Sequence, residues 1–375
     1  MKVNKQARLI LQDGSEFYGT HFGAEKSVFG EVVFNTSMTG YQEMLTDPSY
    51  AGQIIVPTYP LIGNYGINNR DVESSQIQVS GFAVHKHSTH PSHSLSTMTL
   101  SEYLNSQGIP GISDIDTRAI TRRLRKFGVM MGSVNISNTP TEEIVDQLKQ
   151  LPSYEEFDYV NKVTTEAIYS WNQGLDISNP KDPSRYRILV GDYGLKYNIL
   201  RMLEARNCDI IAMPANTSAS EVLAHDPDGV LLSPGPGDPQ LLEYAVNCAR
   251  GLIGKLPIMG ICLGNQILAR AFGAQTFKLK FGHRGGNHPV KDLKTGKVYI
   301  TAQNHGYSVD PNSLPPEINV SHINLNDETV EGLEHQSMPI MSIQYHSEAS
   351  PGPLDNETLF DRFIDMISQN AKVKY

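Results

Sequence analysis

Residues 257–273, PIMGICLGNQILARAFG, decide the fold of the second half of this chain. The stretch begins as a short apolar run and continues as a helix-like segment, and Cys262 stands at the junction between Gly260 and Gly264. A sharp turn forces strained backbone angles and a close approach that a Cβ atom would obstruct, and glycine permits both. The pattern therefore predicts a strand, a tight turn that carries the cysteine, and a helix.

The alternation of strand and helix extends over residues 186–273. The strand-like runs lie at 186–194, 209–214, 229–233 and 257–262, and the helix-like runs lie at 195–207, 218–225, 240–253 and 264–273. Such alternation with short connections is typical of a parallel sheet wrapped by helices. We therefore predict an α/β fold with a doubly wound, mostly parallel sheet, in which ligands bind at the carboxyl ends of the strands.

The first 150 residues differ in character and favour a separate mixed α/β domain that is rich in strands. Asp13-Gly14 separates two extended runs, which is a strong signal for a β-hairpin. The runs GEVVFN (30–35) and GQIIVPTY (52–59) are rich in Val and Ile, which favour strands.

Two helices are expected in the same domain. The first covers about 97–107 and ends at Gly108, because glycine commonly ends helices. The second begins after Asp114 or Asp116, covers TRAITRRLRKF, and ends at Gly128.

The length of 375 residues exceeds one typical domain, so two domains are expected. Residues 171–185, WNQGLDISNPKDPSR, are crowded with Asn, Gly, Asp, Ser and Pro, a composition typical of a linker. We predict an N-terminal domain over 1–150, a connecting segment over 151–186 and a second domain over 187–375.

Charge and cysteine content exclude several classes of protein. A net charge of −9 argues against a surface that binds nucleic acid, because such a surface needs a positive field. Three cysteines give no disulfide framework and suit a reducing compartment. No run approaches the roughly 20 apolar residues of a membrane helix. We therefore expect a soluble, cytoplasmic protein.

Cys262 is a candidate nucleophile. The N-terminus of the following helix carries partial positive charge, which favours the thiolate, and the Leu263 N–H is free to bind a developing oxyanion. The alternative is a buried structural cysteine beside glycines that serve helix packing. Cys208 and Cys248 are cysteines of that inert kind.

A base for this nucleophile is expected at His346, in the run IMSIQYHSEASPGP. Glu348 lies two residues further on, so in extended backbone both side chains project to the same side. Glu348 would then orient the imidazole while His346 exchanges a proton with Cys262. The run LLSPGPGDP offers the Gly235 N–H as a second oxyanion donor, although a plain tight turn uses the same residues.

The motifs GICLGNQ, PGPGDP and QYHSEASPGP together resemble the class I glutamine amidotransferases. The N-terminal run GEVVFNTSMTGYQEMLTDPSYAGQIIVPTYPLIGNYG and the runs SDIDTRAITRRLR, KFGHRGGNHPV and TAQNHGYSVD are similar to small subunits of glutamine-dependent carbamoyl phosphate synthetases. The resemblance covers about residues 7–370. It adds the class I amidotransferase fold to the expected second domain.

The resemblance implies hydrolysis of L-glutamine to glutamate and ammonia through a thioester on Cys262, with His346 as the base and Glu348 as the orienting acid. It also implies the glutamine-binding residues, which are Ser49, Gly235, Gly237, Leu263, Gln266, Asn304, Gly306 and Tyr307. Ser49 would bring the first domain into the glutamine cleft.

The partner implied by the resemblance is a large subunit that uses ATP, Mg²⁺ and bicarbonate and receives the ammonia. The chain itself has no G-x-x-x-x-G-K-[ST] loop and is expected to hold no cofactor and no metal. We expect a heterodimer or a higher oligomer of heterodimers, with no nucleic acid and no membrane. Two alternatives stay open: an amidotransferase subunit of another synthetase, and a non-catalytic glutamine-binding regulatory subunit. The choice between the arginine and pyrimidine pathways stays open too.

Two positions depart from the family pattern. Asn265 stands where histidine is usual, and Ser347 stands where proline is usual. Asparagine cannot titrate near neutral pH, so we expect an altered affinity for glutamine. Serine would loosen the backbone between His346 and Glu348, because proline restricts φ. The histidine-rich run 85–93, HKHSTHPSH, could suggest a metal site, but it has no carboxylate or cysteine and better fits a solvated connection.

Overall fold

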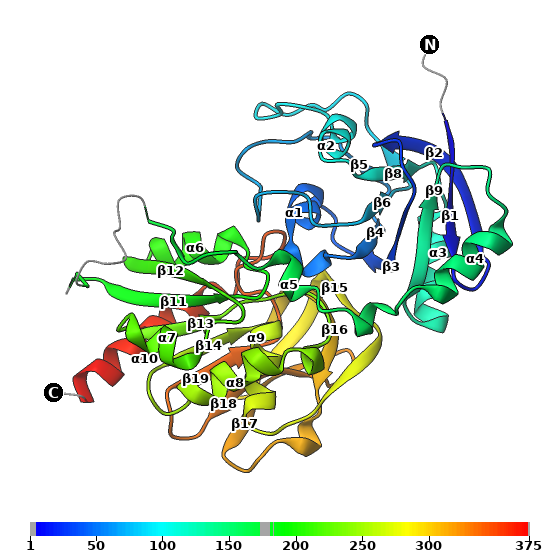
Figure 1. The fold of residues 1–375 in the computed structure, drawn as a ribbon. Helices are drawn as coiled ribbons and strands as arrows, with labels where there is room; N and C mark the ends of the chain where they lie inside the picture. The colour runs from blue at the N-terminus through cyan, green and yellow to red at the C-terminus, as the bar shows by residue number, and fades with distance from the viewer. Residues whose placement is uncertain (1–4, 173–180, 183, 374–375) are drawn as a thin grey trace. The chain divides into compact units, whose positions relative to one another are not determined.

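The computed structural model describes residues 5–172, 181–182 and 184–373. The chain divides into two compact units, Met1–Phe157 and Asp158–Tyr375 (Figure 1). Part of the expected connecting segment, 173–180 and 183, lies outside the described residues. Residues 158–172 carry α5 (Val160–Val163) and β10 (Tyr169–Ser170) and belong to the second unit.

The first unit is built on a closed β-barrel with the strand order β1-β2-β8-β6-β4-β3-β9. Its strands are β1 (Gln6–Leu11), β2 (Glu16–Gly23), β3 (Val28–Asn35), β4 (Gln53–Pro57), β6 (Gly81–Ala83), β8 (Pro110–Ser113) and β9 (Met130–Asn135). A separate two-stranded sheet joins β5 (Leu61–Ile62) to β7 (Lys86–His87). The helices are α1 (Tyr41–Thr46), η1 (Pro48–Tyr50), α2 (Leu100–Ser106), α3 (Thr117–Phe127), α4 (Thr141–Gln150) and η2 (Tyr154–Glu156).

The predicted elements of this unit are present. The Asp13-Gly14 turn joins β1 and β2 as an antiparallel hairpin, and Gly14 adopts φ +84°. Asp116 caps α3, since its side chain accepts a hydrogen bond from the Ala119 N–H. The prediction for α2 was wrong by a few residues at its start: the helix begins at Leu100, because Thr99 forms a capping box with Glu102.

The second unit contains a ten-stranded sheet with the order β10-β12-β11-β13-β14-β19-β18-β17-β15-β16. Its parallel part consists of β11 (Tyr186–Asp192), β12 (Cys208–Pro214), β13 (Gly229–Leu232), β14 (Ile258–Ile261) and β19 (Ile340–Ile343). Its antiparallel extension consists of β15 (Thr276–Asp292), β16 (Val298–Val309), β17 (Ile318–Asn324) and β18 (Val330–His335). The predicted parallel sheet is confirmed, and the extension adds to it.

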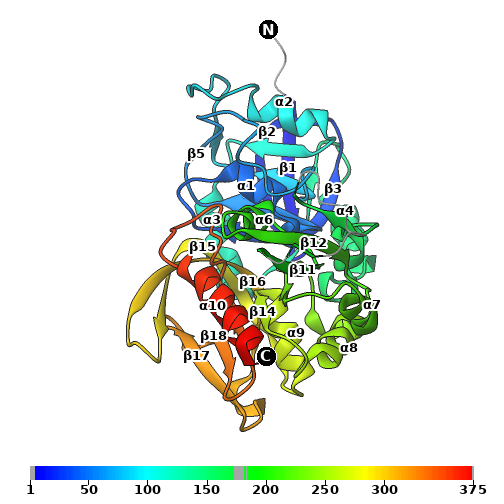
Figure 2. The same cartoon turned by 90° about the vertical axis from the view of Figure 1, so that its left-hand side faces the viewer.

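Helices cover both faces of this sheet, as a doubly wound fold requires (Figure 1). Leu189 of β11 packs with α7 (Ala219–Ala224), α8 (Glu243–Leu252) and α9 (Leu263–Ala271). Its neighbours Ile188 and Val190 pack on the opposite face with α6 (Tyr197–Glu204) and α10 (Thr358–Val373), which Figure 2 shows from that side. The alternation follows from the two-residue period of a strand. The short helices η3 (Pro239–Leu241) and η4 (Pro311–Ser313) lie in loops.

Within the described residues, the helices are all too short or too polar to cross a membrane.

Candidate active site

Cys262 lies at the turn between β14 and α9, where its backbone adopts φ 53° and ψ −103°. This conformation is strained for a residue with a side chain and costs on the order of 1–3 kcal/mol. A Cβ on Gly264 would lie 2.1 Å from the Leu232 carbonyl oxygen, and one on Gly260 would lie 2.6 Å from the Gly264 oxygen. The two glycines are therefore required by close backbone contacts around the cysteine, as the sequence predicted.

The other two cysteines differ from Cys262 in their surroundings. Burial raises the pKa of Cys208 to about 12 and that of Cys248 to about 11, so both thiols stay protonated at neutral pH. Cys262 instead stands at a helix N-terminus with its sulfur 3.7 Å from the Asn304 carbonyl oxygen. Its sulfur also interacts with the imidazole of His346.

His346 and Glu348 contact each other directly, with 2.6 Å between Nδ1 and Oε1. The reason given from the sequence was wrong: β19 ends at Ile343, and His346–Glu348 forms a turn instead of extended backbone. The Ala349 N–H donates to the His346 carbonyl oxygen across this turn, at 3.0 Å. The turn, and not a two-residue strand period, brings the carboxylate to the imidazole.

The charges around His346 favour a protonated ring. Complete burial opposes the charge, but the Glu348 carboxylate and the Cys262 sulfur outweigh it and raise the pKa of His346 to about 10. Since Nδ1 is occupied by Glu348, the Nε2 side of the ring is left to exchange a proton with the sulfur. The arrangement thus places a proton beside the Cys262 sulfur.

Lys196 balances the negative charge of Glu348, and its role was not predicted from the sequence. Its Nζ lies 3.1 Å from Glu348 Oε1, and it also donates to the Ala349 carbonyl oxygen. Burial favours the neutral acid, but Lys196 and His346 together lower the pKa of Glu348 to about 2. Lys196 is the N-cap residue of α6, in the loop after the carboxyl end of β11 at Asp192, and that position was the signal available in the sequence.

The two residues predicted to supply oxyanion donors, Gly235 and Leu263, are neighbours in the structure. Leu263 is the first residue of α9, so its N–H has no acceptor within the helix. A Cβ on Gly235 would lie 2.1 Å from the Tyr193 carbonyl oxygen and 2.7 Å from Leu263 Cδ2. Only glycine allows this loop to approach the start of the helix so closely. Gly237, with φ +91°, lies in the same loop.

Five of the predicted glutamine-binding residues lie in α9 and β16. The Gln266 Nε2 donates to the Tyr307 carbonyl oxygen at 2.9 Å, and the Asn304 carbonyl oxygen faces the Cys262 sulfur. Gly306 lies between these two residues of β16. Ser49 belongs to the first unit, where its N–H bonds the Asp47 carboxylate, and its role in binding glutamine stays a prediction.

The two departures from the family pattern are both fully buried. Asn265 donates to Gln344 Oε1 at 3.1 Å and accepts from the Ser342 hydroxyl at 2.8 Å. Gln344 also accepts from Gln266 at 3.1 Å, so Asn265 acts on a predicted glutamine-binding residue through one shared amide. Ser347 lies in the turn between the imidazole and the carboxylate.

The run 85–93 contains no metal-type cluster among the described residues. Lys86 and His87 form β7, and the His87 ring stacks on Phe22 with 4.3 Å between centroids. Part of this run is therefore packed and not simply a solvated connection.

Two family models match the chain. Residues 9–134 match the carbamoyl-phosphate synthase small chain, CPSase domain, and residues 189–366 match the class I glutamine amidotransferases. Proteins named carbamoyl phosphate synthase small chain are 50% identical in Syntrophotalea carbinolica, over 98% of this chain and 99% of that protein, and in Bacillus caldolyticus, over 97% of each. A third, from Akkermansia muciniphila, is 50% identical over 98% of this chain and 99% of that protein. The chain therefore belongs to the family of carbamoyl phosphate synthase small chains.

Proposed function

We propose that the chain is the glutamine-hydrolysing small subunit of a carbamoyl phosphate synthetase. The observation that carries the proposal is the arrangement of three buried groups: Glu348 Oε1 lies 2.6 Å from His346 Nδ1, His346 Nε2 has no hydrogen-bond partner among the described residues, and the Cys262 sulfur is near enough to help raise the pKa of His346. A subunit of another synthetase is not favoured, because residues 9–134 match the domain that is particular to this family.

In the first half-reaction the Cys262 thiolate attacks the side-chain amide carbon of L-glutamine. The negative charge that develops on the amide oxygen is stabilised by the N–H groups of Leu263 and Gly235. When the tetrahedral intermediate collapses, the C–N bond breaks and ammonia leaves with a proton from His346. A thioester and a neutral imidazole remain.

In the second half-reaction water hydrolyses the thioester. His346, now neutral, takes a proton from the water molecule as it attacks the thioester carbon. The C–S bond then breaks, which releases glutamate and restores the Cys262 thiolate beside a protonated His346. Glu348 stabilises the imidazolium in both states, since it contacts Nδ1 at 2.6 Å.

We propose that groups from three segments of the second unit hold glutamine beside the sulfur, and the family resemblance adds Ser49 of the first unit. We assign this role to Ser49, Gly235, Gly237, Leu263, Gln266, Asn304, Gly306 and Tyr307. The contacts of Gln266 and Asn304 with the residues around Cys262 support the assignment.

The ammonia is passed to a large subunit that uses ATP, Mg²⁺ and bicarbonate. An enclosed path between the two subunits is needed, because free ammonia is protonated in water and ceases to be a nucleophile. We propose a heterodimer as the functional unit, and a cytoplasmic location is supported by the three unpaired cysteines.

The test compares ammonia release from L-glutamine by the wild-type chain and by Cys262→Ser. We expect the variant to lose at least about a thousandfold in rate, because the nucleophile and its base act as one unit. Equal rates would remove Cys262 from its role, and no hydrolysis by the wild type would favour the non-catalytic regulatory subunit.

A second measurement adds the large subunit with ATP and bicarbonate. We expect the rate of glutamine hydrolysis to rise, because lids and clefts of this kind are completed on assembly. A chain that is already fully active and binds no large subunit would contradict the subunit assignment.

A further inference from the structure

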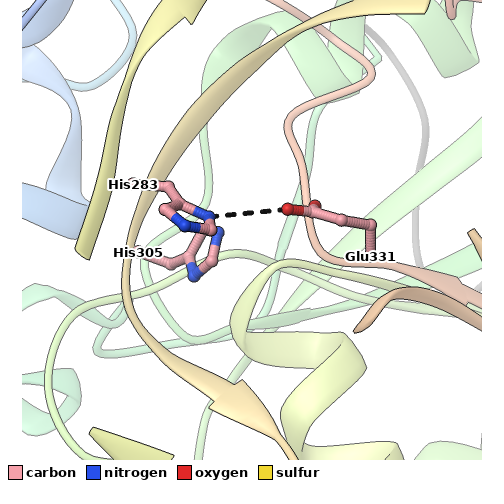
Figure 3. Close-up of side chains that lie close together, drawn as sticks. All are labelled: His283, His305 and Glu331. Atoms are coloured by element: carbon pink, nitrogen blue, oxygen red, sulfur yellow. Dashed lines mark ion pairs between the residues drawn. The ribbon is translucent and has the colours of Figure 1, made fainter. Parts of the chain in front are cut away.

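A second cluster of ionisable side chains lies in the antiparallel part of the sheet in the second unit. His283 of β15, His305 of β16 and Glu331 of β18 are all buried, and their nitrogen and carboxylate atoms lie within 4.8 Å of one another (Figure 3). Two histidines and a carboxylate form a common metal-binding set. The cluster therefore holds either a cation or a proton.

The hydrogen bonds of Glu331 favour a protonated histidine in this cluster over a bound metal ion. Asn324 donates to its Oε1 at 2.8 Å and Gln303 donates to its Oε2 at 3.0 Å, so both oxygens already accept an amide N–H. His283 lies between this carboxylate, 3.5 Å from Nδ1, and that of Asp327, 2.8 Å from Nε2. A carboxylate near each ring nitrogen favours the charged imidazole, and the Asn324 amide nitrogen also lies 3.4 Å from Nδ1.

The positive charge of this cluster lies on the imidazole ring of His283. Burial opposes it, but Asp327 and Glu331 outweigh burial and raise the pKa of His283 to about 9. Burial, and then the charge on His283, lowers the pKa of His288 to about 4 and that of His305 well below its usual value. The positive charge that a metal ion would supply is thus supplied by the His283 imidazolium.

Close polar contacts connect this charge to the glutamine site. Both nitrogens of His305 face oxygen acceptors, so the neutral ring donates a hydrogen bond to one of them. Gln303 contacts Glu331 with its amide nitrogen and lies 2.9 Å from His305 Nε2 with its amide oxygen. His305 Nδ1 lies 2.7 Å from the Tyr307 carbonyl oxygen, which also accepts from Gln266 at 2.9 Å.

The same stretch of β16 contacts both reacting groups through its backbone. The Ala302 carbonyl oxygen accepts the His346 N–H at 2.9 Å, and the Asn304 carbonyl oxygen lies 3.7 Å from the Cys262 sulfur. The side chains of residues 303 and 305 connect β16 to Glu331 and His283. The backbone carbonyls of residues 302 and 304 contact His346 and Cys262. A shift of this strand would therefore displace the glutamine site.

We propose that protonated His283 and Glu331 form a positioning ion pair that holds residues 302–307 of β16 in the geometry needed to bind glutamine, and that the cluster holds no metal. This inference deepens the proposed function and rests on it. Neither residue is catalytic, because both act through Gln303 and His305.

The test measures glutamine hydrolysis by the assembled complex of the chain with its large subunit. For Glu331→Gln and for His283→Gln we expect KM for glutamine to rise about tenfold to a hundredfold while kcat changes less than about threefold, since misplaced binding groups weaken substrate positioning. The double variant removes both charges together and is expected to recover at least about half of the loss on a logarithmic scale.

Glu334→Gln is the matched control. Glu334 lies on the same strand, β18, and pairs with Arg362 at 2.6 Å on the partly exposed side of the sheet. Its removal is expected to leave KM within about twofold, because surface ion pairs contribute little. If the single variants fold poorly, Glu331→Asp keeps the charge and is expected to retain a KM within about threefold of the wild type.

Several results would overturn the inference. One is an unchanged KM in both single variants. Another is a fall in kcat and thermal stability with no specific effect on KM, which would mark a purely structural role. A third is a stoichiometric divalent metal in the purified wild type that is lost in Glu331→Gln. An inactive wild type would instead refute the proposed function.

Discussion

The Nζ of Lys196 lies 3.1 Å from Oε1 of Glu348, and both side chains are buried, with 2% and 0% exposed. A buried carboxylate is tolerated only when it is paired and hydrogen-bonded. Lys196 and His346 share this carboxylate, so the acid that we propose orients the imidazole is itself held ionised by a lysine at the start of α6.

Replacement of Lys196 by Met is expected to impair both activity and stability. The change leaves the Glu348 charge with His346 as its remaining ionic partner, and breaking such a buried pair costs about 3–5 kcal/mol. We expect the rate of glutamine hydrolysis to fall about tenfold to a hundredfold. Urea unfolding and ammonia release measure the two effects. Lys181→Met, which removes a partly exposed ion pair with Asp228 at 2.8 Å, is the control and should cost less than about 1 kcal/mol. Equal effects of the two changes would contradict the special role of Lys196.

Replacement of Gly264 by Ala should destabilise the turn that carries Cys262. The new methyl group would meet the Leu232 carbonyl oxygen at 2.1 Å, and a backbone atom cannot rotate away. We expect the free energy of unfolding to fall by about 3 kcal/mol, at the upper end of the cost of overpacking. The control Gly296→Ala places its methyl group in open space, so strain from φ +73° alone should cost about 1–2 kcal/mol. A Gly264→Ala variant as stable as the wild type would disprove the steric argument.

Asn265 is expected to affect glutamine binding more than catalysis. Asn265→Leu leaves the Ser342 hydroxyl without its acceptor, which costs about 1–3 kcal/mol for a buried group left unpaired, and it removes one of the two donors to Gln344 Oε1. Because Gln344 also bonds Gln266, we expect KM for glutamine to rise about tenfold with kcat nearly unchanged. Steady-state kinetics over a range of glutamine concentrations measure this. A change confined to kcat would show that Asn265 acts on the chemistry instead.

The stability of the chain should depend on pH through the catalytic pair. The contribution of Glu348, whose pKa lies near 2, is present above its ordinary value of about 4.5 and is lost as the pH falls toward 2. The contribution of His346, whose pKa lies near 10, is present below about 6.5 and is lost as the pH rises through 10. Urea unfolding from pH 3 to 11 should show the free energy of unfolding falling at both the acidic and the alkaline end of the range. Glu348→Gln should flatten them, and identical profiles for the variant and the wild type would contradict the assignment.

Much of the fold could be predicted because its causes are local. The apolar run at 186–194 predicts a buried strand, and Asp116 with Gly128 predicts the ends of α3. The closure of the first unit into a barrel was not predicted, because it depends on the pairing of β1 with β9, which lie far apart in the chain.

The features of the candidate site also fall into those that the sequence predicted and those that depend on the tertiary structure. Residues 257–273 by themselves predicted the turn at Cys262, and the contact that requires glycine at position 260, with the Gly264 oxygen, lies within this stretch. The contact that requires glycine at position 264, with Leu232 of β13, comes from the tertiary structure. Only the tertiary structure decided that Lys196 balances Glu348, that a turn brings Glu348 to His346, and that His283 carries a buried charge behind β16. Backbone sterics act over a few residues, whereas the partner of a buried charge depends on which strand ends the sheet places side by side.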